Sequence, residues 1–184
     1  MFLYNKNKKV ILHWMTIIKK YLYLRYEMKN RIIKPSLFIL DVDGVLSSGQ
    51  FLYDSSGKQY KIFGAHDNEG LKLISSHIKI SFISADSRGF EISKKRVEDL
   101  GFEISLIGED KREDFFEKLN DEVVFMGDGY TDSLIFDKVF YSIAPKNAIS
   151  YAIERADFVT NSNAAEGAVF EACMHLKEKF FNEW

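Results

Sequence analysis

Short apolar runs alternate with amphipathic stretches along most of the chain. The run Ser36–Leu40 carries no charge and has the length of a strand that is buried on both faces. Further strands are predicted at 78–83, 104–107, 123–126, 139–143 and 158–159. Helices are predicted between them, at 68–76, 90–100, 110–119, 132–138, 148–155 and 168–180. This alternation predicts an α/β fold, a Rossmann-like three-layer sandwich with a mostly parallel central sheet.

A hairpin interrupts this alternation after the first strand. Two strand-like runs, Gln50–Tyr53 and Gln59–Phe63, flank a short turn that contains a glycine. In the helix that follows the hairpin, the apolar spacing predicts that Leu71, Leu73 and Ile74 face inward. No linker rich in proline or glycine divides the chain after this point, so we expect one domain at residues 35–184.

Composition restricts the class of protein. The chain has 184 residues, of which 46% are hydrophobic and 28% charged, a balance that suits a globular domain. The net charge of −2 gives no argument for nucleic-acid binding. Cys173 is the single cysteine, so no intramolecular disulfide can form, and we expect a cytoplasmic location.

The first 34 residues differ from the rest because they carry nine basic residues and one acidic residue. Their apolar stretch at 10–18 is too short to cross a bilayer. The pattern predicts a basic amphipathic helix, which residues 1–27 could lay on a membrane surface or a partner. We favour a simpler interpretation, in which this segment is an appendage or an upstream stretch read from a wrong start codon, with Met28 as the true start.

Polar residues follow three of the predicted strands. Asp41 and Asp43 follow the first strand, Ser84 follows the strand at 78–83, and Asp128 follows the strand at 123–126. Parallel strands end at the same edge of a sheet, where ligands bind in such folds. These side chains are therefore expected to share one site.

The chemistry of these residue types suits phosphoryl transfer. Two neighbouring carboxylates do not titrate independently, so Asp41 and Asp43 can supply a nucleophile and a general acid. With Asp128 they offer the oxygen ligands that suit a divalent cation. Ser84 and Lys111 could bind the oxygens of a phosphoryl group, together with backbone N–H groups.

Four segments resemble the motifs of the haloacid dehalogenase superfamily, and they occur in its order. Residues 41–46 (DVDGVL) resemble motif I, and Ser84 is similar to the Ser or Thr of motif II. Asp110 and Lys111 resemble motif III, and residues 127–132 (GDGYTD) resemble motif IV. The resemblance extends from residue 37 to about residue 176.

The resemblance implies a role for each acid. Asp41 would attack phosphorus and form an aspartyl-phosphate, and Asp43 would protonate the leaving oxygen and then activate water. Mg²⁺ would bind Asp41, Asp128 and the backbone carbonyl of Asp43, with Asp132 supporting the site.

The resemblance also implies the phosphate contacts. Ser84, the adjoining Ala85 and Lys111 would hold the phosphoryl group. Arg112 is the competing candidate for the role of Lys111.

The motif spacing narrows the branch of the superfamily. The gaps from Asp41 to Ser84 and from Ser84 to Lys111 are filled by predicted elements and leave no room for a cap domain. A capless member with a hairpin resembles the 3-deoxy-D-manno-octulosonate 8-phosphate (KDO 8-phosphate) phosphatase group, in which the hairpins of a homotetramer form a central barrel. This implies an eight- or nine-carbon sugar-acid phosphate as substrate, of the KDO 8-phosphate or sialate 9-phosphate type, and a place in lipopolysaccharide or capsule biosynthesis. The alternative is a non-catalytic tetramerisation module that supports a sugar-nucleotide synthetase.

Several departures from that group fall on substrate-contacting positions. Asp86 stands where the group often has arginine, and Arg88 is expected to compensate for it. His66 and Asp67 lie in a segment that resembles the group's basic-Asp-Gly-x-Gly pattern, and Glu166 lies in its tail pattern. We therefore take Asp67, His66, Arg88 and Glu166 as candidate substrate contacts.

Overall fold

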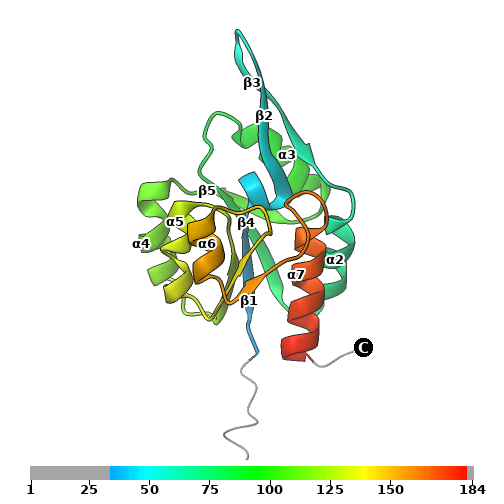
Figure 1. Cartoon of the computed structure of the whole chain (residues 1–184), viewed down its shortest axis with the longest axis vertical. Coiled ribbons are helices and arrows are strands. Elements are labelled where there is room, and N and C mark those ends of the chain that lie inside the picture. Colours follow the sequence, from blue (N-terminus) through cyan, green and yellow to red (C-terminus); the bar gives the residue numbers. More distant parts are fainter. Residues whose placement is uncertain (1–33, 182–184) are drawn as a thin grey trace, which may run out of the picture. The chain divides into compact units, whose positions relative to one another are not determined.

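The computed structural model describes residues 34–181, and in this range a six-stranded sheet forms the centre of the fold (Figure 1). Its strands lie in the order β5-β4-β1-β6-β7-β8, and every neighbouring pair runs parallel. They are β1 (Leu37–Asp41), β4 (Lys79–Ser84), β5 (Glu103–Leu106), β6 (Val123–Met126), β7 (Tyr141–Ala144) and β8 (Phe158–Val159). The predicted α/β fold with a parallel sheet is confirmed.

Helices cover both faces of the sheet (Figure 1). One face packs against α2 (Asp67–Ile74), α3 (Phe90–Asp99) and α7 (Ala168–Leu176). The other packs against α4 (Arg112–Glu117), α6 (Ser150–Arg155) and the short helical turn Phe136–Lys138, with α5 (Tyr130–Ser133) beside them. The remaining turns are Val42–Leu46, Glu109–Lys111 and Lys177–Phe181.

The uncharged run of β1 is explained by this sandwich. Phe38 and Leu40 belong to the core on the α2/α7 side, whereas Leu37 and Ile39 belong to the core on the α4/α6 side. Successive side chains of a strand point to opposite faces, so a central strand has no solvent-facing position for a polar residue. The strand therefore ends in a fixed place between two packed cores, and the residue that follows its apolar part, Asp41, is fixed with it.

The hairpin consists of β2 (Ser47–Asp54) and β3 (Gly57–Phe63), paired antiparallel and separate from the main sheet. It extends beyond the carboxyl edge of the sheet (Figure 1). The hairpin and α2 fill the chain between β1 and β4, and in the described residues no cap domain stands there. The predicted hairpin insertion is confirmed, with strands longer than expected.

Two local predictions are wrong. The helix expected at 132–138 is a short α5 followed by a separate helical turn at Phe136–Lys138. α5 starts early because the carboxylate of Asp132 accepts hydrogen bonds from the backbone N–H groups just before it. Leu73 was expected to face inward, but its side chain is 48% exposed. Leu71 and Ile74 are three residues apart and share the buried face of α2, which turns Leu73 away from it.

Two sequence predictions concern contact with a membrane. Within residues 34–181, no helix has the length and apolar character needed to cross a bilayer. The basic amphipathic helix expected within residues 1–34, and its contact with a membrane surface or partner, fall on residues 1–33, outside the described range. They stay predictions.

The contact between α2 and α7 generates a stability prediction. A Cβ added to Gly70 on α2 would lie 2.6 Å from the Cα of Phe170 on α7, closer than side-chain carbon can approach backbone. We expect Gly70→Ala to lower the free energy of unfolding by about 1–3 kcal/mol, since overpacking outweighs the better helix propensity of alanine. Urea unfolding followed by circular dichroism measures this. Lys72→Ala, on the exposed side of the same helix, is the control, and an equal change in both variants would contradict the close approach.

Candidate active site

The three strand ends singled out in the sequence meet in the structure. β4, β1 and β6 are adjacent in the sheet. Asp41 is the last residue of β1, Ser84 is the last residue of β4, and Asp128 follows β6 by two residues. At this edge lies a pocket of about 610 Å³ whose lining includes Asp41, Asp43 and Asp128. The parallel sheet thus brings together side chains that are up to 87 positions apart in the chain.

A glycine in the turn after β1 allows the backbone of this turn to contact the side chain of Asp128. Gly44 has a φ of +90°, a left-handed conformation that glycine adopts without strain. A Cβ at this position would lie 2.0 Å from an oxygen of Asp128. The carboxylate of Asp128 therefore packs directly on the backbone of the first motif, and any other residue at position 44 would push it away.

Three carboxylates gather on one side of the pocket. One oxygen each from Asp41, Asp128 and Asp132 lie within 4.8 Å of one another. Burial, opposed by Arg112 and reinforced by the charge of Asp43, raises the pKa of Asp41 to about 6. Burial and the charge of Asp41 raise the pKa of Asp128 to about 7. A set of hard oxygen donors whose negative charges are this crowded fits a divalent cation such as Mg²⁺.

Arg112 is the cation inside this cluster. It is the first residue of α4, its side chain is 5% exposed, and it forms ion pairs with both Asp41 and Asp132. The other oxygen of Asp132 accepts the backbone N–H groups of Asp128 and Gly129 at 3.1 and 2.9 Å. Asp132 is therefore fully engaged in holding Arg112 and the loop after β6, which suits the supporting role expected for it.

The structure places Lys111 and Arg112 in different surroundings. The side chain of Lys111 is exposed and is not among the residues that line the pocket, whereas Arg112 is buried and lines it. The chain passes through the helical turn Glu109–Lys111 before α4 begins, and this turn directs residue 112 rather than residue 111 toward the carboxylates. Of the two candidates, Arg112 is the one that lines the pocket and pairs with Asp41.

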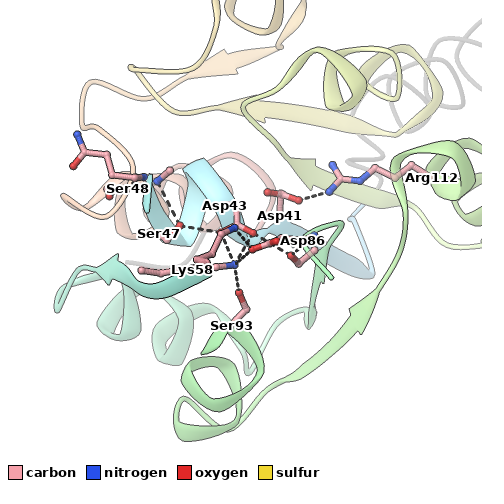
Figure 2. A network of polar contacts seen from close by, with 12 residues as sticks. Asp41, Asp43, Ser47, Ser48, Lys58, Asp86, Ser93 and Arg112 are labelled. Carbon is pink, nitrogen blue, oxygen red and sulfur yellow. Dashed lines mark hydrogen bonds and ion pairs between the residues drawn. The ribbon is translucent and has the colours of Figure 1, made fainter. Parts of the chain in front are cut away.

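Asp43 turns away from Asp41 and joins a second polar cluster (Figure 2). Its Oδ2 accepts a hydrogen bond from Ser84 Oγ at 3.1 Å, and Lys61 Nζ lies 2.8 Å from its Oδ1. The Ser84 hydroxyl also accepts the backbone N–H of Asp86 at 3.2 Å. Two carboxylates separated by one residue thus have different surroundings, and Asp43 is not part of the three-carboxylate group.

The lysines of this second cluster were missed in the sequence. Lys58 and Lys61 both come from β3 and both pair with Asp86. Burial alone would raise the pKa of Asp86, but the hydrogen bonds from the two lysines lower it to about 2. Residues three apart on a regular strand point to opposite faces, so periodicity gave no reason to group these lysines.

A β-bulge explains how both lysines reach one carboxylate. Leu52 pairs with Tyr60 and Tyr53 pairs with Lys58, which leaves Gln59 as an extra residue on β3. The bulge rotates the strand between the two lysines. Lys58 also stands over the ring of Phe51, with its Nζ 3.4 Å from the ring centroid.

The candidate substrate contacts divide into two groups. Arg88 and Ala85 line the pocket, and Arg88 is exposed. The assignment of His66, Asp67 and Glu166 as substrate contacts stays a prediction, and none of the three lines the pocket. Their surroundings show why.

Each of these three residues has a partner outside the pocket. Asp67 is 1% exposed and accepts the backbone N–H of Phe170 at 3.2 Å, so it caps the start of α7. The side chain of His66 is 77% exposed and lies near Glu69. Glu166 is exposed and accepts a hydrogen bond from Asn163.

Comparison with known proteins places this geometry in a family. Residues 114–172 match the haloacid dehalogenase-like hydrolase family. The chain is 33% identical over 145 residues to the 3-deoxy-D-manno-octulosonate 8-phosphate phosphatase KdsC of Salmonella typhi, an alignment that covers 74% of this chain and 76% of that protein. The same values relate it to KdsC of Escherichia coli strain K12.

Solved structures that resemble this chain include phosphatases of the same kind. The 3-deoxy-D-manno-octulosonate 8-phosphate phosphatase of Moraxella catarrhalis, in complex with a magnesium ion, a phosphate ion and KDO, is 29% identical with a TM-score of 0.70, over 80% of this chain and 88% of that chain. The cobalt-bound deoxy-D-mannose-octulosonate 8-phosphate phosphatase of Haemophilus influenzae is 27% identical with a TM-score of 0.69, over 80% and 90% of the two chains. Sequence, fold and the arrangement of the acids point the same way: the chain belongs to the 3-deoxy-D-manno-octulosonate 8-phosphate phosphatase family of the haloacid dehalogenase-like hydrolases.

Proposed function

We propose that this protein is a magnesium-dependent phosphatase that hydrolyses an eight- or nine-carbon sugar-acid phosphate through an aspartyl-phosphate on Asp41. The observation that carries the proposal is the meeting of Asp41, Asp43 and Asp128 in one pocket at the carboxyl edge of the sheet. A nucleophile, a separate acid–base group and a metal-binding carboxylate are the groups that this chemistry requires.

The proposed reaction has two half-reactions. A carboxylate oxygen of Asp41 attacks phosphorus, the bond from phosphorus to the sugar oxygen breaks, and Asp43 gives its proton to that oxygen. Asp43 then takes a proton from water, which attacks phosphorus, releases phosphate and restores the Asp41 carboxylate. The different surroundings of the two acids support this division, because Asp41 pairs with Arg112 whereas Asp43 contacts Ser84 and Lys61 (Figure 2).

Asp41 and Asp128 are the carboxylates proposed to hold Mg²⁺, with Asp132 behind them. When bound, the ion would neutralise these carboxylates and the phosphoryl oxygens. Burial raises the pKa of both Asp41 and Asp128, and the charge of Asp41 raises that of Asp128 further, effects that a cation would oppose. The proposed backbone-carbonyl ligand at Asp43 stays a prediction.

The phosphoryl group itself is proposed to lie between Arg112 and the loop after β4. Arg112 offers a planar fork of N–H donors, a geometry that matches phosphate oxygens. Ala85 lines the pocket next to Ser84, so the backbone of this loop is in reach. Ser84 is fully buried and donates to Asp43, so we assign it the orientation of that acid in addition to phosphate binding.

The substrate class follows from the relatives, which are named for KDO 8-phosphate, and from the charges at the pocket. Of the cations that line it in the described part of the chain, Lys58 and Arg112 are ion-paired, whereas Arg88 has no such partner. We assign Arg88 to the carboxylate of the sugar acid. This compensates for Asp86, which stands where the family often has arginine.

The alternative of a non-catalytic assembly module gains no support, because the acids and a cation are all present in one pocket. A homotetramer built through the hairpin stays a prediction. It is consistent with the large apolar side chains that the hairpin exposes, which are Phe51, Leu52, Tyr53, Tyr60 and Ile62.

Removal of the nucleophile tests the central proposal. We expect Asp41→Asn to lower phosphate release from KDO 8-phosphate, in the presence of Mg²⁺, by at least about 10³-fold, because an amide cannot form the aspartyl-phosphate. Release of inorganic phosphate measures this. Asp99→Asn, on the exposed side of α3, is the control, and turnover that persists in Asp41→Asn would contradict the mechanism.

Arg112 and Lys111 form a natural pair for comparison. Loss of the buried guanidinium in Arg112→Met should lower kcat/KM by about 10²-fold or more, because no other cation in the described chain contacts Asp41. Lys111→Met should change it by less than about twofold, since its side chain is exposed. Steady-state kinetics of the two variants under the same conditions decides between the two residues, and the reverse order would restore Lys111.

Metal affinity should depend on pH. Because Asp41 and Asp128 have pKa values of about 6 and about 7, both are partly protonated at pH 6, and Mg²⁺ must displace these protons. The apparent Kd for Mg²⁺ should therefore rise about 20-fold between pH 8 and pH 6. Calorimetric titration in buffers with different ionisation enthalpies gives both the affinity and the protons released. Asp86→Asn should leave this slope unchanged because its pKa of about 2 keeps it ionised throughout, and a flat profile in the unmodified protein would contradict the carboxylate site.

A further inference from the structure

Lys61 is a charged side chain with no exposure to solvent. Its side chain is 0% exposed, and its Nζ lies 2.8 and 2.9 Å from the two oxygens of Asp43. The same Nζ lies 2.9 Å from Asp86 Oδ2 and donates to Ser93 Oγ at 2.7 Å. A buried ammonium is costly unless it is paired and hydrogen-bonded, and here each direction of its three N–H bonds has an acceptor.

This side chain joins four separate parts of the fold. Lys61 comes from β3, Asp43 from the turn after β1, Asp86 from the loop after β4, and Ser93 from α3. The chain packs closely against it at Gly89. A Cβ added to Gly89 would lie 2.8 Å from the Cε of Lys61 and 2.3 Å from Asp86 Oδ2. The position of the ammonium is therefore fixed by the surrounding chain.

The contacts of Asp43 show what this fixed position does. Lys61 approaches both of its oxygens, and Ser84 donates to Oδ2 at 3.1 Å. These donors hold the carboxylate in a single orientation, whereas the residue itself is only partly buried at the pocket wall. An acid that must meet first a leaving oxygen and then a water needs the same position in both half-reactions.

Asp86 is the second carboxylate that pairs with Lys61. Two lysines and two aspartates make up the cluster, and Lys61 is shared between Asp43 and Asp86. Lys58 pairs with Asp86. Among the described residues, Lys61 is the ammonium that pairs with Asp43. The two lysines of β3 thus differ in their contact with Asp43, and this difference can be tested.

We infer that Lys61 is the positioning residue for Asp43, and that the hairpin, through this one buried ammonium, sets the orientation of the acid that protonates the leaving group. The inference rests on the proposed function and adds a role for the hairpin within its own subunit. Lys61 touches Asp43 and not the reacting atoms, so it acts through the acid.

The test uses two phosphate esters that differ in their need for an acid. The leaving group of p-nitrophenyl phosphate departs without a proton, whereas the alkoxide of an alkyl monophosphate such as glycerol phosphate requires one. For Lys61→Met we expect kcat/KM to fall about 10²-fold with the alkyl ester and less than about threefold with the p-nitrophenyl ester. For Lys58→Met the two esters should change by the same factor. An equal fall with both esters in Lys61→Met would overturn the inference.

A double-mutant cycle gives the second criterion. If Lys61 acts only through Asp43, then Lys61→Met should lower kcat/KM for the alkyl ester by less than about threefold when Asp43→Asn is already present. A full additional loss in the double variant would mean that Lys61 acts elsewhere. Turnover retained by Asp41→Asn would instead contradict the proposed function, so the two failures are distinct.

Unfolding is the remaining explanation to separate. Thermal unfolding of Lys61→Met should show one cooperative transition. If the variant does not fold, Ser93→Ala removes a single hydrogen bond to the ammonium and keeps its charge. This variant should show a smaller loss in kcat/KM that is again confined to the alkyl ester, and a loss shared by both esters would overturn the inference.

Discussion

Five aspartates line one pocket at the carboxyl edge of the sheet. The repulsion among their charges is the constraint that the rest of the site must offset. Three buried cations stand against them: Arg112 between Asp41 and Asp132, and the two lysines of β3 beside Asp43 and Asp86. Carboxylates this deeply buried would otherwise take up protons, as Asp128 shows. The pairing is incomplete around Asp41 and Asp128, and that is where a divalent cation fits.

The turn after β1 divides this charge into two parts. Asp41 ends a strand packed between two cores, and Asp43 lies beyond it on a turn that Gly44 makes possible. Asp41 faces Arg112, and Asp43 faces the lysines (Figure 2). Two chemically identical residues can therefore perform different steps, because their neighbours differ.

Much of this arrangement is present in the sequence as pattern. The uncharged run before Asp41 predicted a doubly buried strand, and the polar residues after three such runs predicted one shared site, since parallel strands end together. The pattern did not predict the direction of side chains next to a local irregularity. The helical turn at Glu109–Lys111 leaves Lys111 exposed and is followed by Arg112, which lines the pocket. A capping role drew Asp67 away from the pocket and into the start of α7.

The sequence by itself determined the order of the elements, the acids at the strand ends and the family to which they belong, because hydrophobic periodicity and short motifs are local properties. Only the tertiary structure decided which cations balance those acids. Lys58 and Lys61 lie on a strand whose regular period would separate them, and a bulge at Gln59 brings both to Asp86. Their partners lie 18 to 32 positions away along the chain, and no local pattern carries that information.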